Sequence, residues 1–168
     1  MTVLPDYDSP IALKAFLDAR GMAMQKKFGQ NFMVNRAHRE RLIDALGIGD
    51  GSSVWEIGPG LGAMTASILD RGAKLTAFEI DRGFCVVLRE IFAEKPGFTL
   101  VEGDVLKKWG DVARLEGAPS HLFGNLPYNI AAAIVGDMIS EGLRFDTIVI
   151  TVQKEVALRM AAKPGTED

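Results

Sequence analysis

The sequence has few residues that build disulfides or metal sites, and it has no long apolar run. Its 168 residues include one cysteine and two histidines. Cys85 cannot form an internal disulfide and lies among apolar neighbours, which predicts a buried thiol, while the isolated His38 and His121 do not indicate a metal site. No uncharged apolar stretch approaches the roughly 20 residues of a bilayer span, and the N-terminus lacks a basic, then apolar, secretion signal. We therefore expect a cytoplasmic protein without a metal or a membrane segment.

The sequence also lacks a surplus of positive charge. Its 19 basic and 22 acidic side chains give a net charge of -3, so overall charge cannot supply affinity for a nucleic acid. Short basic clusters do occur, and each is either a solvated face or a local contact for a polyanion. They are Lys26 and Lys27; Arg36, Arg39 and Arg41; and Lys107 and Lys108. The apolar fraction of 48% and charged fraction of 24% are those of one ordinary globular domain.

The apolar positions first repeat with helical spacing and then alternate between strand and helix patterns. Two helices are predicted near the N-terminus: one capped by Ser9 with a stop near Gly21, and one capped by Asn35 that ends at Gly47. Beyond them the pattern predicts strands at 53–57, 74–78, 98–101, 121–124 and 145–151, helices at 61–71, 82–93, 130–141 and 153–162, and a less regular stretch at 107–115. Such alternation predicts an α/β protein with a parallel, doubly wound sheet.

A glycine-rich loop joins the first predicted strand of this sheet to a helix. The segment Glu56-Ile57-Gly58-Pro59-Gly60-Leu61-Gly62 would let the backbone approach a ligand closely. Such a loop is weak evidence by itself, because nicotinamide and flavin enzymes use a similar one. However, Glu79 ends the next strand 21 positions after Gly58, which is about the spacing at which an acid reaches ribose hydroxyls. The loop and the acid together predict a cofactor that contains a nucleoside.

Three residues favour a nucleoside cofactor other than a dinucleotide. Pro59 lies within the loop, Glu56 lies just before it, and Asp104 follows the third predicted strand. Asp104 either accepts a hydrogen bond from an adenine amine or caps a turn or helix after Gly103. The first interpretation completes a cofactor pocket that has no need of a pyrophosphate.

The segment Asn125-Leu126-Pro127-Tyr128 follows a short apolar strand, so it should lie at the carboxyl end of that strand, where open α/β sheets bind ligands. The Asn125 side-chain oxygen and the Leu126 carbonyl, which the following proline holds extended, could accept hydrogen bonds from an exocyclic amine. Tyr128 could stack on a base, a contact worth roughly 1 to 3 kcal/mol. A turn capped by the asparagine and packed by the tyrosine explains these residues equally well.

Six motifs, taken in their order along the chain, resemble the ribosomal RNA adenine dimethyltransferase family. They are Lys27-Phe28-Gly29-Gln30-Asn31-Phe32, the glycine loop from Glu56 to Gly62, Glu79-Ile80-Asp81, Gly103-Asp104, the segment from Gly124 to Ile130, and Gln153-Lys154-Glu155-Val156-Ala157. The resemblance spans nearly the whole chain and implies the Rossmann-like fold of class I S-adenosylmethionine-dependent methyltransferases. It also implies that a monomer dimethylates two adjacent adenosines near the 3′ end of small-subunit ribosomal RNA, with that RNA or the pre-assembled small subunit as its partner.

The resemblance further implies roles for single residues. An N-terminal segment, residues 1–34, would cover S-adenosylmethionine through Gln30, Asn31 and Met33, the last of which stands where the family usually has leucine. The core, residues 35–168, would hold the cofactor through Glu56, Gly58, Gly60, Glu79, Ile80, Asp104, Val105 and Asn125. The target adenine would be held by Asn125, Leu126, Pro127 and Tyr128. Phe28 or Phe32 either closes over that base or staples the next helix.

Members of this family continue beyond the point where the present chain ends, at Lys163 to Asp168. The resemblance implies two more strands and a small helical domain, which would supply basic surface for RNA. The chain is either a genuinely short protein, a fragment, or a chain cut at an exposed loop, and Pro164 and Gly165 near its end favour the last of these. We therefore expect residues 1–168 to form a single truncated catalytic domain that binds the cofactor but methylates poorly.

Two other functions remain open from the sequence, besides a remote dehydrogenase. A large-subunit adenine methyltransferase of the antibiotic-resistance type shares the fold and the acceptor motif. An assembly or transcription factor could retain the fold as an RNA-binding platform without turnover. Such a platform would not need Asn125, Pro127, Tyr128 and Glu79 together, which favours the enzyme.

Overall fold

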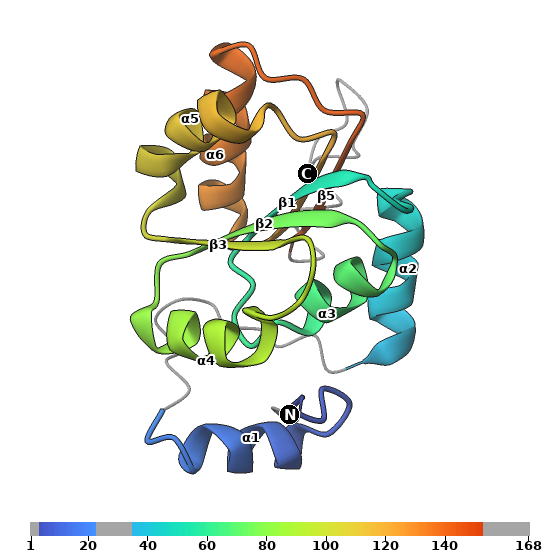
Figure 1. The fold of residues 1–168 in the computed structure, drawn as a ribbon, viewed down its shortest axis with the longest axis vertical. Helices are drawn as coiled ribbons and strands as arrows, with labels where there is room; N and C mark the ends of the chain where they lie inside the picture. Colours follow the sequence, from blue (N-terminus) through green and yellow to red (C-terminus); the bar gives the residue numbers. More distant parts are fainter. Residues whose placement is uncertain (1–3, 23–34, 153–168) are drawn as a thin grey trace, which may run out of the picture.

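The computed structural model describes residues 4–22 and 35–152, apart from the side chains of Tyr128 and Asn129. Five parallel strands form one sheet in the order β3-β2-β1-β4-β5 (Figure 1). The strands are β1 Ser53–Ile57, β2 Lys74–Glu79, β3 Phe98–Glu102, β4 His121–Asn125 and β5 Thr147–Thr151. The described helices are α1 Pro10–Asp18, α2 Arg36–Leu46, α3 Ala63–Asp70, α4 Arg82–Phe92, α5 Val105–Glu116 and α6 Tyr128–Ser140. This confirms the predicted α/β class and parallel sheet.

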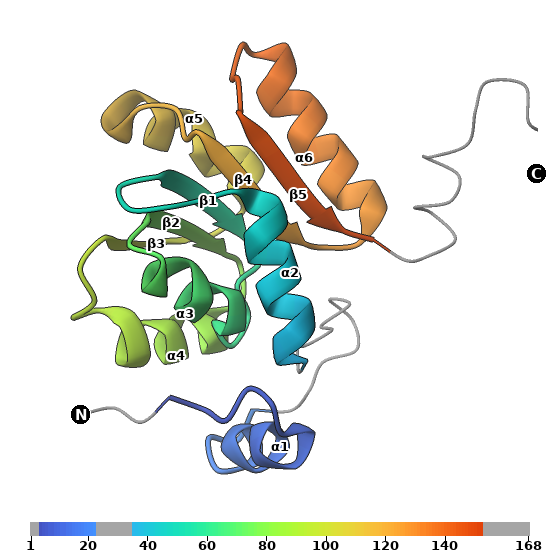
Figure 2. The same cartoon turned by 90° about the vertical axis from the view of Figure 1, so that its right-hand side faces the viewer.

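Helices cover both faces of the sheet. Figure 2 shows α5 and α6 on one face and α2, α3 and α4 on the other, with α1 lying beyond α4. The alternation of β1 explains this arrangement, because successive side chains of a strand point to opposite faces. Trp55 and Ile57 pack in a cluster with α5 and α6, whereas Val54 packs with residues of α2 and α3. A sheet buried on both faces is the usual environment of parallel strands.

Both N-terminal helices begin at the predicted caps and α2 ends as predicted at Gly47, whereas α1 ends at Asp18, before the predicted stop near Gly21. The Ser9 hydroxyl accepts a hydrogen bond from the Ala12 amide, and the Asn35 side chain accepts one from the His38 amide. Gly47 ends α2 with a φ of 69°, a left-handed conformation that glycine adopts at little cost. The predicted burial of Cys85 is also confirmed, since its side chain lies in α4 with no exposed surface.

The predicted irregular stretch at 107–115 is wrong, because this region belongs to the 12-residue helix α5. Asp104 caps the helix by accepting a hydrogen bond from the Leu106 amide at 3.1 Å. Val105, Trp109 and Val112 are spaced at helical intervals and are buried against the sheet. The apolar face of this helix is harder to recognise in the sequence, because Lys107, Lys108 and Gly110 lie between its members.

Smaller differences concern element ends. Helix α6 begins at Tyr128 instead of about residue 130, directly after Pro127, which provides no side-chain cap. Strand β5 begins at Thr147, two residues later than predicted. The predicted helix at 153–162 lies outside the described residues.

Gly62, at the end of the glycine loop, packs closely against Phe92 of α4, and a larger residue there would test this packing. A Cβ added to it would lie 2.4 Å from Cε2 of the buried Phe92 ring, and its φ of 84° disfavours other residues. We expect Gly62→Ala to lower the free energy of unfolding by about 1 to 3 kcal/mol in urea denaturation. The control Gly110→Ala lies in α5 with no atom within 4 Å of its added Cβ, so it should stabilise by up to about 1 kcal/mol. Equal effects of the two variants would contradict this account.

Candidate functional site

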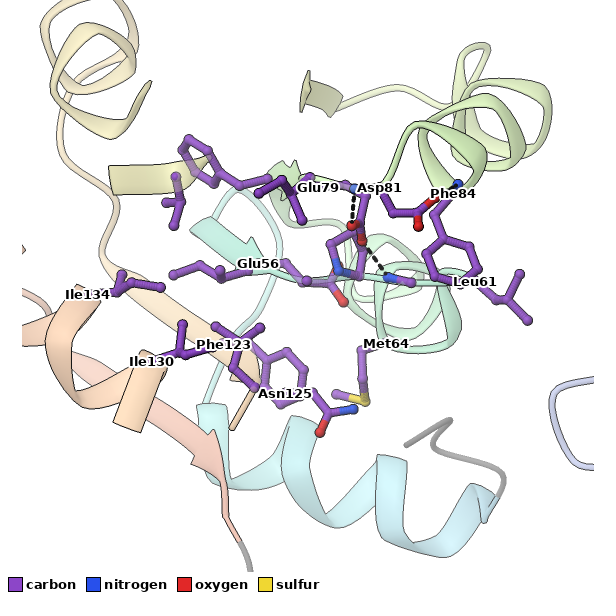
Figure 3. A pocket seen from close by; sticks show the side chains of 18 of the residues that line it. Glu56, Leu61, Met64, Glu79, Asp81, Phe84, Phe123, Asn125, Ile130 and Ile134 are labelled. Carbon is purple, nitrogen blue, oxygen red and sulfur yellow. Dashed lines mark hydrogen bonds between the residues drawn. The ribbon is translucent and has the colours of Figure 1, made fainter. Parts of the chain in front are cut away.

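The candidate site lies where the connections of the sheet change direction. From β1 the chain continues to β2 and β3 on one side, whereas β4 continues to β5 on the other side. Ligands in open α/β sheets bind at the carboxyl ends of strands at such a point. A cavity of about 320 Å³ lies there, between the ends of β1, β2 and β4 and the start of α5 (Figure 3). The predicted site residues among its lining are Glu56, Gly58, Gly60, Glu79, Ile80, Asp104, Val105, Asn125, Leu126 and Pro127.

The glycine loop after β1 lines this cavity. Gly58 has a φ of 71°, and its amide donates a hydrogen bond to the Phe78 carbonyl at 2.9 Å. A Cβ on Gly58 would lie 2.8 Å from Cδ2 of Leu126. The positive φ therefore favours glycine at this position, and the flexible end of the Leu126 side chain lies close to where a Cβ would be. The loop after β1 and the segment after β4 thus lie in direct contact.

Glu79 joins the glycine loop to the start of α4. One carboxylate oxygen accepts a hydrogen bond from the Gly60 amide at 3.0 Å, and the other accepts from the Asp81 amide at 2.9 Å (Figure 3). The side chain is 5% exposed, and its burial raises the pKa of Glu79 while these amide hydrogen bonds oppose the increase. Each carboxylate oxygen has a second lone pair, so Glu79 can hold the loop and still accept from ligand hydroxyls.

Glu56 is the second buried acid of the cavity. Its carboxyl group is 1% exposed and accepts a hydrogen bond from the Thr65 hydroxyl at 2.7 Å. Burial raises the pKa of Glu56 from 4.5 to about 8; the Thr65 hydrogen bond lowers it, and the negative charge of Glu79 raises it further. At neutral pH the group is therefore mainly protonated and can donate as well as accept a hydrogen bond.

Three predicted cofactor-binding residues, Ile80, Asp104 and Val105, line the cavity after β2 and at the start of α5. Asp104 both caps α5 and lines the cavity, so the two interpretations made from the sequence are compatible. Val105 is buried, whereas Ile80 is 60% exposed. An exposed isoleucine beside a cavity can cover the face of a flat ligand.

The acceptor segment lies at the end of β4, as predicted. Asn125 is the last residue of β4 and is paired in register with Thr151, the last residue of β5. The Thr151 hydroxyl donates a hydrogen bond to the Asn125 side-chain oxygen at 2.5 Å. An amide oxygen can accept two hydrogen bonds. Leu126 and Pro127 line the cavity, and the backbone of Tyr128 begins α6.

The sequence did not predict Thr151, Tyr7 or Leu13 as parts of the site. Thr151 is brought to Asn125 by strand register, a long-range contact that local patterns do not reveal. Tyr7 and Leu13 reach the cavity from the N-terminal segment. The predicted residues Gln30, Asn31 and Met33, together with Phe28 and Phe32, lie outside the described residues.

The sequence model of the ribosomal RNA adenine dimethylase family matches residues 21–168. The chain belongs to this family. Ribosomal RNA small subunit methyltransferase A from Treponema denticola is 52% identical over 98% of the chain, and that from Treponema pallidum is 48% identical over 96%. The alignments cover 57% and 55% of these relatives, so the chain spans little more than half their length.

Solved structures agree with this family assignment. A dimethyladenosine transferase from Plasmodium falciparum has a TM-score of 0.66 and 27% identity, covering 79% of this chain and 46% of that one. The 23S rRNA methyltransferase ErmE has a TM-score of 0.60 and 26% identity, covering 76% and 50%. The described sheet therefore has the predicted Rossmann-like fold of class I methyltransferases.

No cluster of three or more histidine, cysteine, aspartate or glutamate side chains within residues 4–22 and 35–152 could hold a metal ion. No helix in these ranges is long and apolar enough to cross a bilayer.

Because the pKa of Glu56 is raised, the free energy of unfolding should decrease as the pH rises. The folded protein retains the Glu56 proton up to about pH 8, whereas the group in an unfolded chain loses it near its ordinary pKa of 4.5. Folding therefore takes up a proton in this window, and the contribution of Glu56 to stability falls as the pH rises. Relative to Glu56→Gln, the wild-type protein should lose up to about 1.4 kcal/mol per pH unit between about pH 5 and 8.

Urea denaturation at several pH values measures this difference. Glu94→Gln, which changes an exposed carboxyl group beyond α4, is the matched control for the substitution itself. A stability difference between wild type and Glu56→Gln that stays constant across the window would contradict the buried, protonated state.

Proposed function

We propose that this protein transfers methyl groups from S-adenosylmethionine to the exocyclic amines of two adjacent adenosines in small-subunit ribosomal RNA. The main supporting observation is that the glycine loop and the acceptor segment, residues 125–127, lie close together and line the same cavity. Glu79 holds the loop by accepting a hydrogen bond from the Gly60 amide. Family membership and the names of the bacterial relatives support the same reaction. One domain formed by residues 1–168, acting as a cytoplasmic monomer, is part of the proposal.

The chemistry of the cavity fits S-adenosylmethionine. Gly58 and Gly60 leave room for its amino-acid arm, Glu79 offers acceptors to the ribose hydroxyls, and Asp104 offers one to the adenine amine. Ile80 and Val105 would contact the adenine face, and Glu56 lies beneath the loop. Gln30, Asn31 and Met33 would cover the cofactor. The volume of about 320 Å³ is at the lower end of the range for small-molecule sites.

The target adenine would lie on the other side of the glycine loop. When bound, S-adenosylmethionine supplies an electrophilic methyl group, so the protein mainly has to align the amine and exclude water. The Asn125 side-chain oxygen and the Leu126 carbonyl would accept the amine hydrogens, while Tyr128 would stack on a base splayed out of its helix. Thr151 fixes Asn125, because its hydroxyl donates to the same oxygen.

Alignment accounts for most of this proposed catalysis. Correct orientation of two reactants supplies several kcal/mol, up to about 7 to 11 in favourable intramolecular cases. No strong general base is required, because methylation makes the amine acidic and its proton can leave to solvent. The acceptor hydrogen bonds would favour the attacking geometry of the amine nitrogen.

The similarity to the 23S rRNA methyltransferase ErmE, at 26% identity, supports the large-subunit alternative. The names of the Treponema relatives, at 52% and 48% identity, favour the small subunit. A binding platform without turnover is disfavoured by the joint presence of Glu79 and Asn125 in one cavity. A titration that compares S-adenosylmethionine with NAD separates the methyltransferase from a dehydrogenase.

The substrate can be identified with labelled S-adenosylmethionine and with unmodified small and large ribosomal subunits, tested in separate reactions. We expect this chain to bind the cofactor and to place the label, slowly, on adenosines near the 3′ end of the small-subunit RNA. Label on large-subunit RNA, or cofactor binding without any transfer, would contradict the proposed substrate. Rapid turnover would contradict the expectation that surface beyond this chain assists RNA binding.

Asn125 provides the test of the mechanism. Removing one acceptor should cost about 1 to 3 kcal/mol, so Asn125→Ala should slow single-turnover transfer roughly 10- to 100-fold. Thr151→Val should slow it less, because Asn125 remains but loses its orienting donor. Ser140→Ala, at the far end of α6, is the control. Transfer by Asn125→Ala at the wild-type rate would show that this acceptor has no part in the mechanism.

A further inference from the structure

Residues 4–22 form an N-terminal segment that contributes Tyr7 and Leu13 to the lining of the cavity. Most of this segment precedes residue 21, where the match to the family model begins. Its helix α1 lies on the outer side of α4, away from the sheet (Figures 1 and 2). Leu13 and Leu17 of α1 are buried in a cluster with Phe84 and Leu88 of α4. The segment is therefore fixed to the core by a substantial apolar contact.

Tyr7 connects this segment to the glycine loop. Its hydroxyl donates a hydrogen bond to the Leu61 carbonyl at 2.8 Å, between residues 54 positions apart in the sequence. The side chain is 9% exposed and lines the cavity together with Gly60 and Leu61. Burial, followed by the negative charge of Glu56, raises the pKa of Tyr7, whereas Arg39 lowers it. The hydroxyl therefore remains a hydrogen-bond donor under physiological conditions.

Asp8, the next residue, anchors the same segment to a different element. Its carboxylate accepts a hydrogen bond from the Arg39 guanidinium of α2 at 2.7 Å. The Arg39 side chain is 7% exposed, so water screens this ion pair less than an ordinary surface pair. Two consecutive residues thus tie the segment to the glycine loop and to α2.

We propose that Tyr7 is a positioning residue for the amino-acid arm of the cofactor, acting through the Leu61 carbonyl and the glycine loop. The inference rests on the proposed function, which places that arm over Gly58 and Gly60. Both glycines have positive φ values, so side-chain sterics restrict the loop little, and contacts from outside must hold it. Glu79 braces the loop from β2, and Tyr7 braces it from the N-terminal segment.

This role predicts a selective effect on ligands. The nucleoside part of the cofactor would be held by Glu79 and Asp104. Among the described residues, the Tyr7 hydroxyl donates its hydrogen bond to the Leu61 carbonyl and not to either of these two residues. Loss of the Tyr7 hydroxyl should therefore weaken ligands that carry the amino-acid arm and spare ligands that lack it. General damage to the fold would weaken both kinds of ligand.

Calorimetric titration of the 168-residue protein with S-adenosylhomocysteine and with adenosine tests the inference. For Tyr7→Phe, we expect the dissociation constant of S-adenosylhomocysteine to rise roughly three- to ten-fold, the usual effect of one lost hydrogen bond. The dissociation constant of adenosine should change by less than about two-fold. Equal losses for both ligands, or no loss for either, would overturn the proposal.

Two further variants complete the test. Asp8→Asn weakens the neighbouring anchor without altering the cavity lining, and it should show the same selective loss, which keeps the test decisive if Tyr7→Phe does not fold. Ile11→Ala changes an 83% exposed side chain of α1 and is the control, with both dissociation constants unchanged. If the wild-type protein binds neither S-adenosylhomocysteine nor S-adenosylmethionine, the proposed function itself fails, and this is seen before any variant is compared.

Discussion

The parallel pairing of β1 with β4 is the constraint on which the rest of the site depends. The two strands are neighbours in the sheet although 63 residues separate Ile57, the last residue of β1, from His121, the first residue of β4, and Ile57 pairs with Gly124. Their connections leave in opposite directions, so the residues beyond them line one opening from two sides. The closeness of Gly58 to Leu126 follows from this pairing, and the positive φ of Gly58 favours glycine at that position. The proposed donor and acceptor halves meet because the sheet changes direction there.

Glu56 and Glu79 are both buried in this cavity, but different hydrogen bonds compensate their burial. Burying an ionised carboxylate is unfavourable unless hydrogen bonds compensate it. The Glu79 carboxylate accepts hydrogen bonds from the backbone amides of Gly60 and Asp81, which lie in separate loops. The Glu56 carboxyl group accepts one from the Thr65 hydroxyl, and its pKa is raised to about 8. The different partners give the two carboxyl groups different properties: Glu79 organises the backbone around the cavity, and Glu56 is available as a neutral donor. Such shifted groups concentrate at functional sites, which supports the placement of the site in this cavity.

Much of the fold and part of the site could be predicted from the sequence, because the signals were local. The caps Ser9 and Asn35, the glycine loop and the polar ends of buried strands each leave a pattern within a few residues. Helix α5 was missed because Lys107, Lys108 and Gly110 interrupt its apolar stripe. The roles of Thr151 and Tyr7 could not be predicted, since strand register brings one to Asn125 and tertiary packing brings the other to Leu61. Local patterns therefore predicted the elements, while long-range contacts determine how their residues are oriented.

The cofactor and the target adenine are proposed to bind next to each other, where the glycine loop meets the acceptor segment, and nuclear magnetic resonance can test this with the isotope-labelled 18.2 kDa chain. S-adenosylhomocysteine should shift the backbone amide signals of Gly58, Gly60, Glu79 and Asp104. Adenosine monophosphate, added once the cofactor product saturates the protein, should shift Leu126 and Ile130 without displacing that product. Displacement of one ligand by the other, or shifts of the same amides by both, would contradict a two-ligand site.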